Sequence, residues 1–98
     1  MATHGAARDR TILNLRTLNP FQRRGFAMSL IAGKFNGTGR LQGDTLAAYM
    51  SADVTHTVLS YGTPIAWVNT DGTVTVPEDK YSVTTTHHQN LCKVYLNN

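Results

Sequence analysis

The sequence has a single cysteine, no long apolar run and no leader-like start, and each absence excludes a class of protein. One cysteine, Cys92, among 98 residues cannot form an internal disulfide, and it fits a reducing compartment. No apolar run approaches the roughly 18 residues of a membrane span. Residues 1–8 also lack the apolar stretch of a secretory signal. We therefore expect one small cytosolic domain with no membrane contact.

Motifs for nucleophilic or phosphate chemistry are missing too. The sequence has no Gly-x-Ser-x-Gly elbow, and the Asn-Gly-Thr-Gly stretch at 36–39 is not followed by the Lys-Ser/Thr of a phosphate-binding loop. His87 and His88 would lie about 100° apart on a helix, whereas two metal ligands on one helix face need a spacing of three or four residues. We expect no metal and no cofactor.

Charge is sparse and unevenly placed. Residues 1–42 carry a net charge of +6 and residues 43–98 a net charge of −3. In the first half, Phe21-Gln22-Arg23-Arg24-Gly25-Phe26 places basic residues beside aromatic ones, as nucleic-acid-binding surfaces do. Arg23 and Arg24 are therefore candidate nucleic-acid contacts, which other arginines could extend from a flexible arm: Arg8, Arg10 and Arg16. The alternative is a solubilising surface with the two phenylalanines in the core.

The N-terminal half predicts few regular elements. Residues 1–11 show no apolar period, so we expect a flexible basic tail there and a single domain over 12–98. The apolar residues of 12–18 follow no clear period. Over about 25–32 they alternate, which favours a strand.

A short helix is predicted over 45–52. Asp44 precedes this alanine- and leucine-rich stretch as a good N-cap. Leu46, Tyr49 and Met50 fall at helical spacing and would form the buried stripe.

The second half predicts an antiparallel sheet with strands over 54–59 and 65–70. Asp71-Gly72 is typical of a two-residue type I′ hairpin turn, which would pair Trp67 with Val76 across the strands. It would place four residues on the core face: Ile65, Trp67, Val74 and Val76. For the connection at 61–64, a turn at 62–63 and a register shifted by one residue both fit.

Hydroxyl side chains open a last predicted helix, over about 86–96. Thr86 and Gln89 have capping-box spacing, and Thr85 is a competing cap. Helical spacing predicts the buried stripe: His87, His88, Leu91, Val94 and Tyr95. For His88 we favour a buried imidazole bonded to a sheet hydroxyl such as that of Ser60 or Ser82. A polar binding cleft and a small enzyme centred on His88 are the alternatives.

The series Ser60-Tyr61-Gly62-Thr63-Pro64-Ile65-Ala66-Trp67, Asp71-Gly72, Tyr81-Ser82-Val83-Thr84-Thr85 and His88-Gln89 resembles a family of short proteins of unknown function encoded by actinobacteriophages and some of their hosts. The shared pattern covers about 55–89. His87 departs from it, because that family usually has a basic or small residue there. The resemblance implies a phage or prophage origin and action inside an infected bacterium, but no activity.

Taken together, we expect an α+β domain with an antiparallel sheet of three or four strands, a short helix and a C-terminal helix. The expected function is non-enzymatic binding of a host macromolecule. The candidate binding residues are the polar positions of the shared pattern: Tyr61, Thr63, Tyr81, Ser82, Thr85, His88 and Gln89. Their surface would join the start of the last helix to the 61–64 turn.

Overall fold

The computed structural model describes the backbone of residues 3–23 and 28–98, and the side chains of 9–22 and 29–98. Within these residues the chain forms three helices and five strands. In chain order they are α1 (Thr3–Thr17), β1 (Gln22–Arg23), β2 (Met28–Ala32), α2 (Gly43–Ser51), β3 (Val54–Ser60), β4 (Thr63–Asn69), β5 (Val74–Thr75) and α3 (Val83–Tyr95). The predicted α+β class is confirmed, and the two-residue strands β1 and β5 extend the sheet at its edges.

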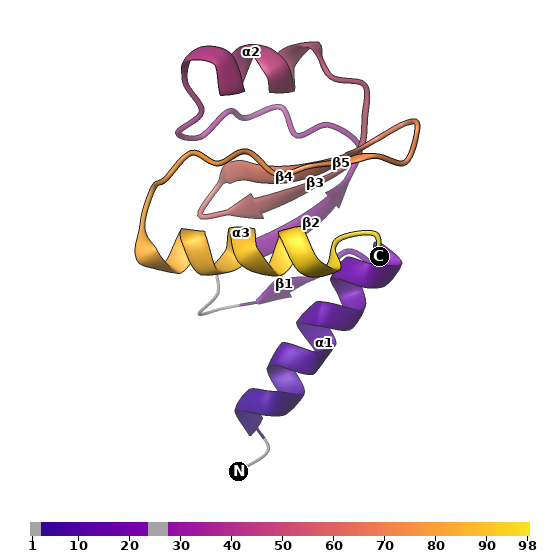
Figure 1. Ribbon diagram of the computed structural model, residues 1–98. Helices are drawn as coiled ribbons and strands as arrows, with labels where there is room; N and C mark the ends of the chain where they lie inside the picture. The colour runs from indigo at the N-terminus through magenta and orange to yellow at the C-terminus, as the bar shows by residue number, and fades with distance from the viewer. Residues whose placement is uncertain (1–2, 24–27) are drawn as a thin grey trace.

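The sheet is an antiparallel meander with the strands side by side in chain order, β1-β2-β3-β4-β5. Helices α1 and α3 cover one face, and α2 with its flanking loops covers the other (Figure 1). Because both faces are covered, β4 has no solvent-facing side and is buried from Thr63 to Val68. An apolar run without alternation is the sequence signature of such a strand.

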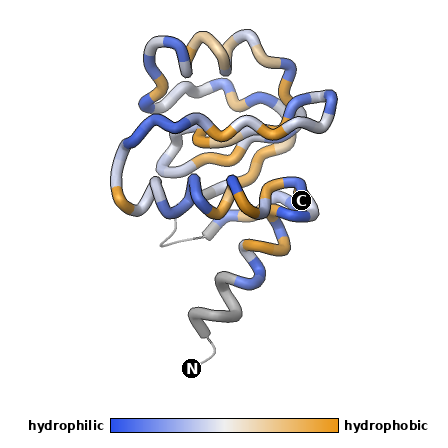
Figure 2. The backbone as a smooth tube through the Cα atoms, viewed as in Figure 1, coloured by the Kyte–Doolittle hydropathy of each residue, from blue (hydrophilic) through white to orange (hydrophobic). Residues whose placement is uncertain are grey.

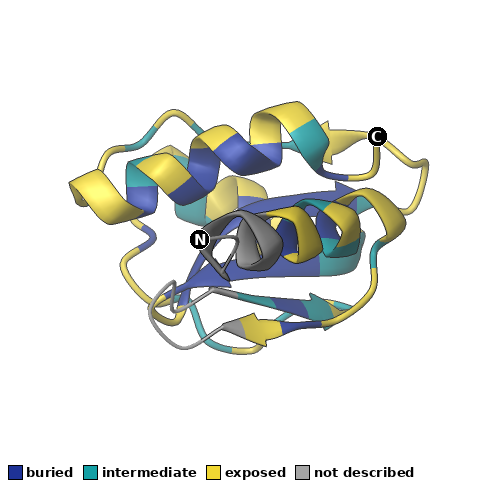
Figure 3. Ribbon diagram, turned by 90° about the horizontal axis from the view of Figure 1, so that it is seen from below, coloured by how far each residue is buried: buried dark blue, intermediate teal, exposed yellow. Residues whose placement is uncertain are grey.

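Each face of the sheet has its own core. The larger core joins α1, the strands and α3: Leu15, Phe21, Leu30, Val58, Ile65, Ala66, Val68, Leu91, Cys92 and Leu96. The smaller one, under α2, is built from Leu41, Tyr49 and Trp67, and its two rings lie 4.8 Å apart. The hydrophobic segments of the strands and the banded pattern of α3 are visible in Figure 2, and Figure 3 shows the buried sheet beneath the helices.

Helix α1 replaces the tail expected over 1–11. From Thr3 onward the segment is helical, and the helix continues to Thr17. Thr11 and Leu15 are fully buried, so the second half of α1 is part of the core although its apolar residues follow no clean period. The first half runs away from the sheet (Figure 1). The strand expected over about 25–32 is present as β2, and 24–27 lies outside the described residues.

The register predicted around Asp71-Gly72 is wrong by one residue. Trp67 pairs with Thr75, not with Val76, and Val74 is 37% exposed instead of core-facing. A type I′ turn needs positive φ at both central residues, but within this loop Gly72 alone has it, at 89°. Asp71 instead accepts hydrogen bonds from the backbone N–H and the hydroxyl of Thr73, which also lower its pKa. The result is a three-residue loop.

The tight turn lies between β3 and β4 instead. Tyr61 and Gly62 have φ of 53° and 81°, and Ser60 pairs directly with Thr63. The turn is thus one residue earlier than the 62–63 position considered from sequence. A bulge follows, because Leu59 pairs with Pro64 and Val58 with Ala66, so that Ile65 has no partner. A proline inside a sheet is tolerated at such a bulge.

Both later helices begin earlier than expected. Helix α2 has Gln42 at its N-cap and Asp44 in its first turn, where the carboxylate still meets the positive end of the helix dipole. Helix α3 begins at Val83 with Ser82 as its cap, so Thr85 and Thr86 lie inside it. The buried stripes of both helices therefore differ from the predicted ones. Met50 and Val94 are 58% and 54% exposed, and His87 is exposed as well.

Candidate functional site

Four polar side chains form a continuous hydrogen-bonded chain between α3 and the end of β3. The hydroxyl of Ser82 donates to that of Thr85 (3.1 Å), and Thr85 lies 3.2 Å from the hydroxyl of Ser60. Ser60 in turn is 2.7 Å from Nδ1 of His88. Three of the predicted site residues therefore converge on one cluster, and the predicted bond between His88 and a sheet hydroxyl is confirmed.

Burial sets the protonation state of His88. Nδ1 of a neutral imidazole either accepts the Ser60 proton or donates its own to Ser60, according to the tautomer. Burial, and to a smaller extent the charge of the adjacent His87, lower the pKa of His88 from 6.5 to about 4. The imidazole is thus neutral at pH 7.

The cluster is closed to solvent. His88 has 0% of its surface exposed, Ser60 1% and Thr85 4%. Ser82 is the exposed end of the chain, where its hydroxyl also accepts the backbone N–H of Thr85 and so caps α3. The cluster therefore fastens the start of α3 to the end of β3.

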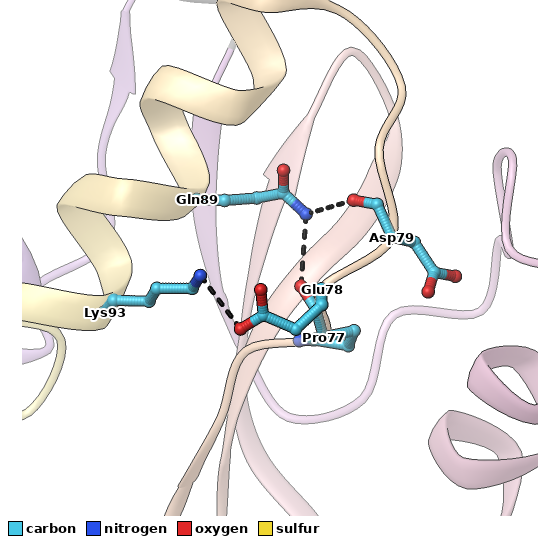
Figure 4. A network of polar contacts seen from close by, with 5 residues as sticks. All are labelled: Pro77, Glu78, Asp79, Gln89 and Lys93. Carbon is cyan, nitrogen blue, oxygen red and sulfur yellow. Dashed lines mark hydrogen bonds and ion pairs between the residues drawn. The ribbon is translucent and has the colours of Figure 1, made fainter.

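Gln89 fastens the segment before α3. Its side-chain amide donates to the carbonyls of Pro77 (3.2 Å) and Asp79 (2.8 Å), as Figure 4 shows. One turn further along α3, Lys93 forms an ion pair of 2.9 Å with Glu78. Both contacts position the 77–79 segment, and the Gln89 side chain, only 5% exposed, is not available to a ligand.

Thr63 supports a neighbouring loop. Its hydroxyl accepts the backbone N–H of Arg40 at 3.0 Å. Gly39, with φ of +53°, lies so close that a Cβ there would be 2.5 Å from Cα of Thr63. The loop that carries Arg40 is thereby held against the Tyr61–Gly62 turn.

The remaining predicted residues stand at the surface. Tyr61 is 60% exposed at its turn, with its ring 6.3 Å from that of His88. Tyr81 is half-buried, and the guanidinium of Arg40 lies 5.9 Å from its ring centre. Partial burial raises the pKa of Tyr81, and the charge of Asp79 raises it further. Val83, next to the cap, is 89% exposed.

Burial divides the seven predicted residues by role. Thr63, Thr85, His88 and Gln89 are buried and support the surface from beneath. Tyr61, Tyr81 and Ser82 reach it. Sequence reasoning missed three surface neighbours, Arg40, Lys80 and Val83. Nothing in the sequence around Arg40 and Lys80 indicates what they contact. Val83 could have been recognised as exposed, because it follows the N-cap residue of a helix.

The arginine pair of the nucleic-acid hypothesis lies largely outside the part of the chain that the structure describes. Arg23 is in β1, its side chain is outside the described set, and Arg24 lies outside the described residues altogether. Phe21 is 9% exposed and belongs to the core, so its ring cannot stack on a base. Phe26 also lies outside the described residues.

The structure also bears on the cysteine, on metal binding and on membrane-spanning segments. Cys92 is a packing residue, because burial raises the pKa of its thiol to about 12 and leaves it protonated. Over the described part of the chain, no group of three or more His, Cys, Asp or Glu side chains comes together as metal ligands would. Of the described helices, none has both the length and the apolar character needed to cross a membrane.

The fold and the site define a small α+β protein with a sealed polar cluster beneath an exposed aromatic and basic surface. The chain belongs to a family of unknown function, DUF8033, whose model matches residues 28–94. The match includes the sheet from β2 to β5 and nearly all of α3, and so the whole candidate site. Searches of curated proteins and of solved structures found no match.

Proposed function

We propose that the protein is non-enzymatic and binds a host macromolecule through an exposed surface beside the start of α3. We call this the turn–helix surface and define it by five residues: Arg40, Tyr61, Lys80, Tyr81 and Val83. One observation carries the proposal. Ser60, Thr85 and His88 are buried, whereas Tyr61, next to Ser60 in the chain, and Val83, next to Ser82, are 60% and 89% exposed. Large exposed apolar side chains favour a partner surface.

The sealed cluster argues against the enzyme alternative centred on His88. A serine hydroxyl 2.7 Å from a histidine nitrogen has the spacing of a nucleophile and its base. Yet neither Ser60 nor His88 is accessible to a substrate. A base with a pKa of about 4 is also a weak proton acceptor at neutral pH. The hydrogen bond is better explained as a tether.

The proposed setting is a bacterium infected by, or carrying, a phage. Its support is the residue series from Ser60 to Gln89, which resembles proteins of actinobacteriophages and their hosts. The partner would then be a host macromolecule in the cytoplasm. A single reduced, buried Cys92 is compatible with that compartment.

A capture experiment with two matched valine variants tests the proposal. Val83 and Val94 are both exposed on α3, about 16 Å apart along the helix axis at 1.5 Å per residue. The immobilised protein is exposed to a nuclease-treated actinobacterial lysate. We expect a protein captured by the wild type and by V94E to be lost with V83E and with Y61A. Equal capture by V83E, with an unchanged melting temperature, would refute the proposed surface.

Nucleic-acid binding is the second candidate, because α1 runs away from the sheet (Figure 1) and carries exposed Arg10 and Arg16. An exposed basic helix can supply phosphate contacts. Binding of a labelled single-stranded DNA should then weaken steeply between 50 and 200 mM salt, by orders of magnitude for several contacts, and should be lost with Arg23→Glu and Arg24→Glu combined. A DNA affinity that does not change with salt concentration would exclude nucleic-acid binding.

A further inference from the structure

The turn–helix surface contains two adjoining hollows. The first, of about 380 Å³, is lined by Arg40, Gln42, Asp79, Lys80 and Tyr81. The second, of about 290 Å³, is lined by Lys80, Tyr81, Ser82, Val83 and Thr86. Lys80 and Tyr81 belong to both, so they form the wall between the two hollows.

The first hollow has unbalanced positive charge. All six acidic residues of the chain lie in the described part, and neither Arg40 nor Lys80 forms an ion pair with any of them. The one carboxylate in the wall, that of Asp79, accepts a hydrogen bond of 2.6 Å from the hydroxyl of Thr45 in α2. Two cations against one carboxylate leave a net charge of +1, which suits a single bound carboxylate.

Arg40 is held in place for such a ligand. Its backbone N–H is bound to Thr63, and its guanidinium lies over the ring of Tyr81. A guanidinium fixed by stacking loses less conformational entropy when it pairs with a carboxylate, and it can pair through two N–H groups at once.

The second hollow offers apolar contact. Val83 is 89% exposed at the first position of α3, and the half-buried Tyr81 lines the same hollow. An apolar side chain that fills this space would remove valine and tyrosine surface from water. Such burial contributes about 25 cal/mol for each Å² of apolar surface.

We propose that the turn–helix surface binds an acidic segment of a protein, with one carboxylate between Arg40 and Lys80 and a neighbouring apolar side chain against Val83 and Tyr81. This inference rests on the proposed function and names the partner's chemistry. A nucleic-acid backbone fits less well, because its successive phosphates would meet Asp79 in the first hollow and the apolar lining of the second. The spacing of the hollows requires the acidic and apolar groups to be near neighbours in the partner.

Three synthetic peptides provide the probe. The first is a fluorescein-labelled twelve-residue peptide of Glu and Leu within Gly and Ser, the second replaces Glu by Gln, and the third replaces Leu by Ser. Fluorescence anisotropy gives the affinities, and amide chemical shifts locate the binding. We expect the Glu/Leu peptide to bind about tenfold more tightly than either counterpart, the effect of one charge-assisted pair or one buried side chain. Shifts should concentrate at 39–42 and 79–86.

Two charge variants complete the test. K80E should weaken binding of the Glu/Leu peptide about tenfold or more. R10E makes the same charge change on α1, at an exposed residue that lines neither hollow, and should leave the affinity within about twofold. Equal binding of the Glu and Gln peptides, or of wild type and K80E, would overturn the inference. So would tighter binding of a twelve-nucleotide single-stranded DNA at the same residues.

The lysate capture separates this inference from the proposed function. If V83E loses the captured protein and K80E keeps it, the binding surface stands and the acidic partner is wrong. If both variants lose it and R10E keeps it, the inference is supported. If V83E still captures the protein, the proposed surface is wrong, and so is the inference that it binds an acidic segment.

Discussion

Acid should destabilise this protein through His88 in particular. The imidazole has a pKa of about 4 in the folded protein and an ordinary value of 6.5. The folded state therefore binds fewer protons at this site than the unfolded state between about pH 4 and pH 6.5. By linkage, the stabilising contribution is complete above pH 6.5, falls as the pH drops, and stops changing near pH 4.

The size of the effect follows from the two pKa values. Each pH unit within that window changes the free energy of unfolding by up to about 1.4 kcal/mol. Because the transition at 6.5 is gradual, the loss between pH 7 and pH 5 is about 2 kcal/mol. That is a large part of the roughly 5–15 kcal/mol that stabilises a typical small domain.

Urea unfolding at pH 7, 6 and 5 measures this loss. The single tryptophan, Trp67, is 1% exposed, so its fluorescence should report unfolding. His88→Asn is the informative variant, because an amide oxygen can accept the Ser60 hydroxyl near the position of Nδ1 and does not titrate. We expect this variant to lose about 2 kcal/mol less than the wild type between pH 7 and 5.

His87→Asn is the matched control. Its imidazole is exposed and contributes less than burial does to the lowered pKa of His88, so most of the wild-type loss should persist in that variant. The reasoning would be refuted if the wild type and His88→Asn lost the same stability on acidification, because the drop would then come from other groups. It would also fail if His87→Asn removed the drop and His88→Asn did not.

Three further substitutions probe the tethers. Tyr49→Phe removes a hydroxyl that accepts the backbone N–H of Phe35 at 2.7 Å and lies 3.0 Å from the buried hydroxyl of Thr57; thermal unfolding should show a loss of about 1–3 kcal/mol, and an unchanged Tm would contradict this. Ser82→Ala should cost about 1–2 kcal/mol through the lost cap, while the aspartate variant at the same position retains most of it. Gly39→Ala, which would place a Cβ 2.5 Å from Cα of Thr63, should lower the Tm by several degrees more than an alanine in the open space at Gly33.

The sequence predicted the central strands, the class of the fold and the bond of His88 well. Those features depend on local composition, such as the β-branched run of β3, or on the few hydroxyls that a buried imidazole could reach. The hairpin register was missed for a physical reason. Asp71-Gly72 fits two loops that differ by one residue, and the choice depends on the bonds that Asp71 makes to Thr73.

Local sequence patterns could not predict helix α1 or the surface hollows. The apolar residues of α1 contact α3 and the sheet, which are distant in the sequence. No apolar period within residues 3–17 therefore predicts the helix. The hollows arise where the Arg40 loop, Tyr81 and the start of α3 meet. Their contact depends on Gly39 and Thr63, which are 24 positions apart along the chain and touch because of the Tyr61–Gly62 turn.

The attachment of α1 has a consequence for the order in which the protein assembles on the ribosome. The backbone N–H of Asn97 binds the carbonyl of Leu15, and Arg16 binds the carbonyl of Asn98, 82 positions away. The meander of neighbouring strands needs only short loops to close, so we expect it to form while synthesis continues. Helix α1 is made before the sheet, but its contacts with α3, Asn97 and Asn98 can form only after these have emerged. Of the three described helices, α1 is therefore made before the other two and completes its contacts after them.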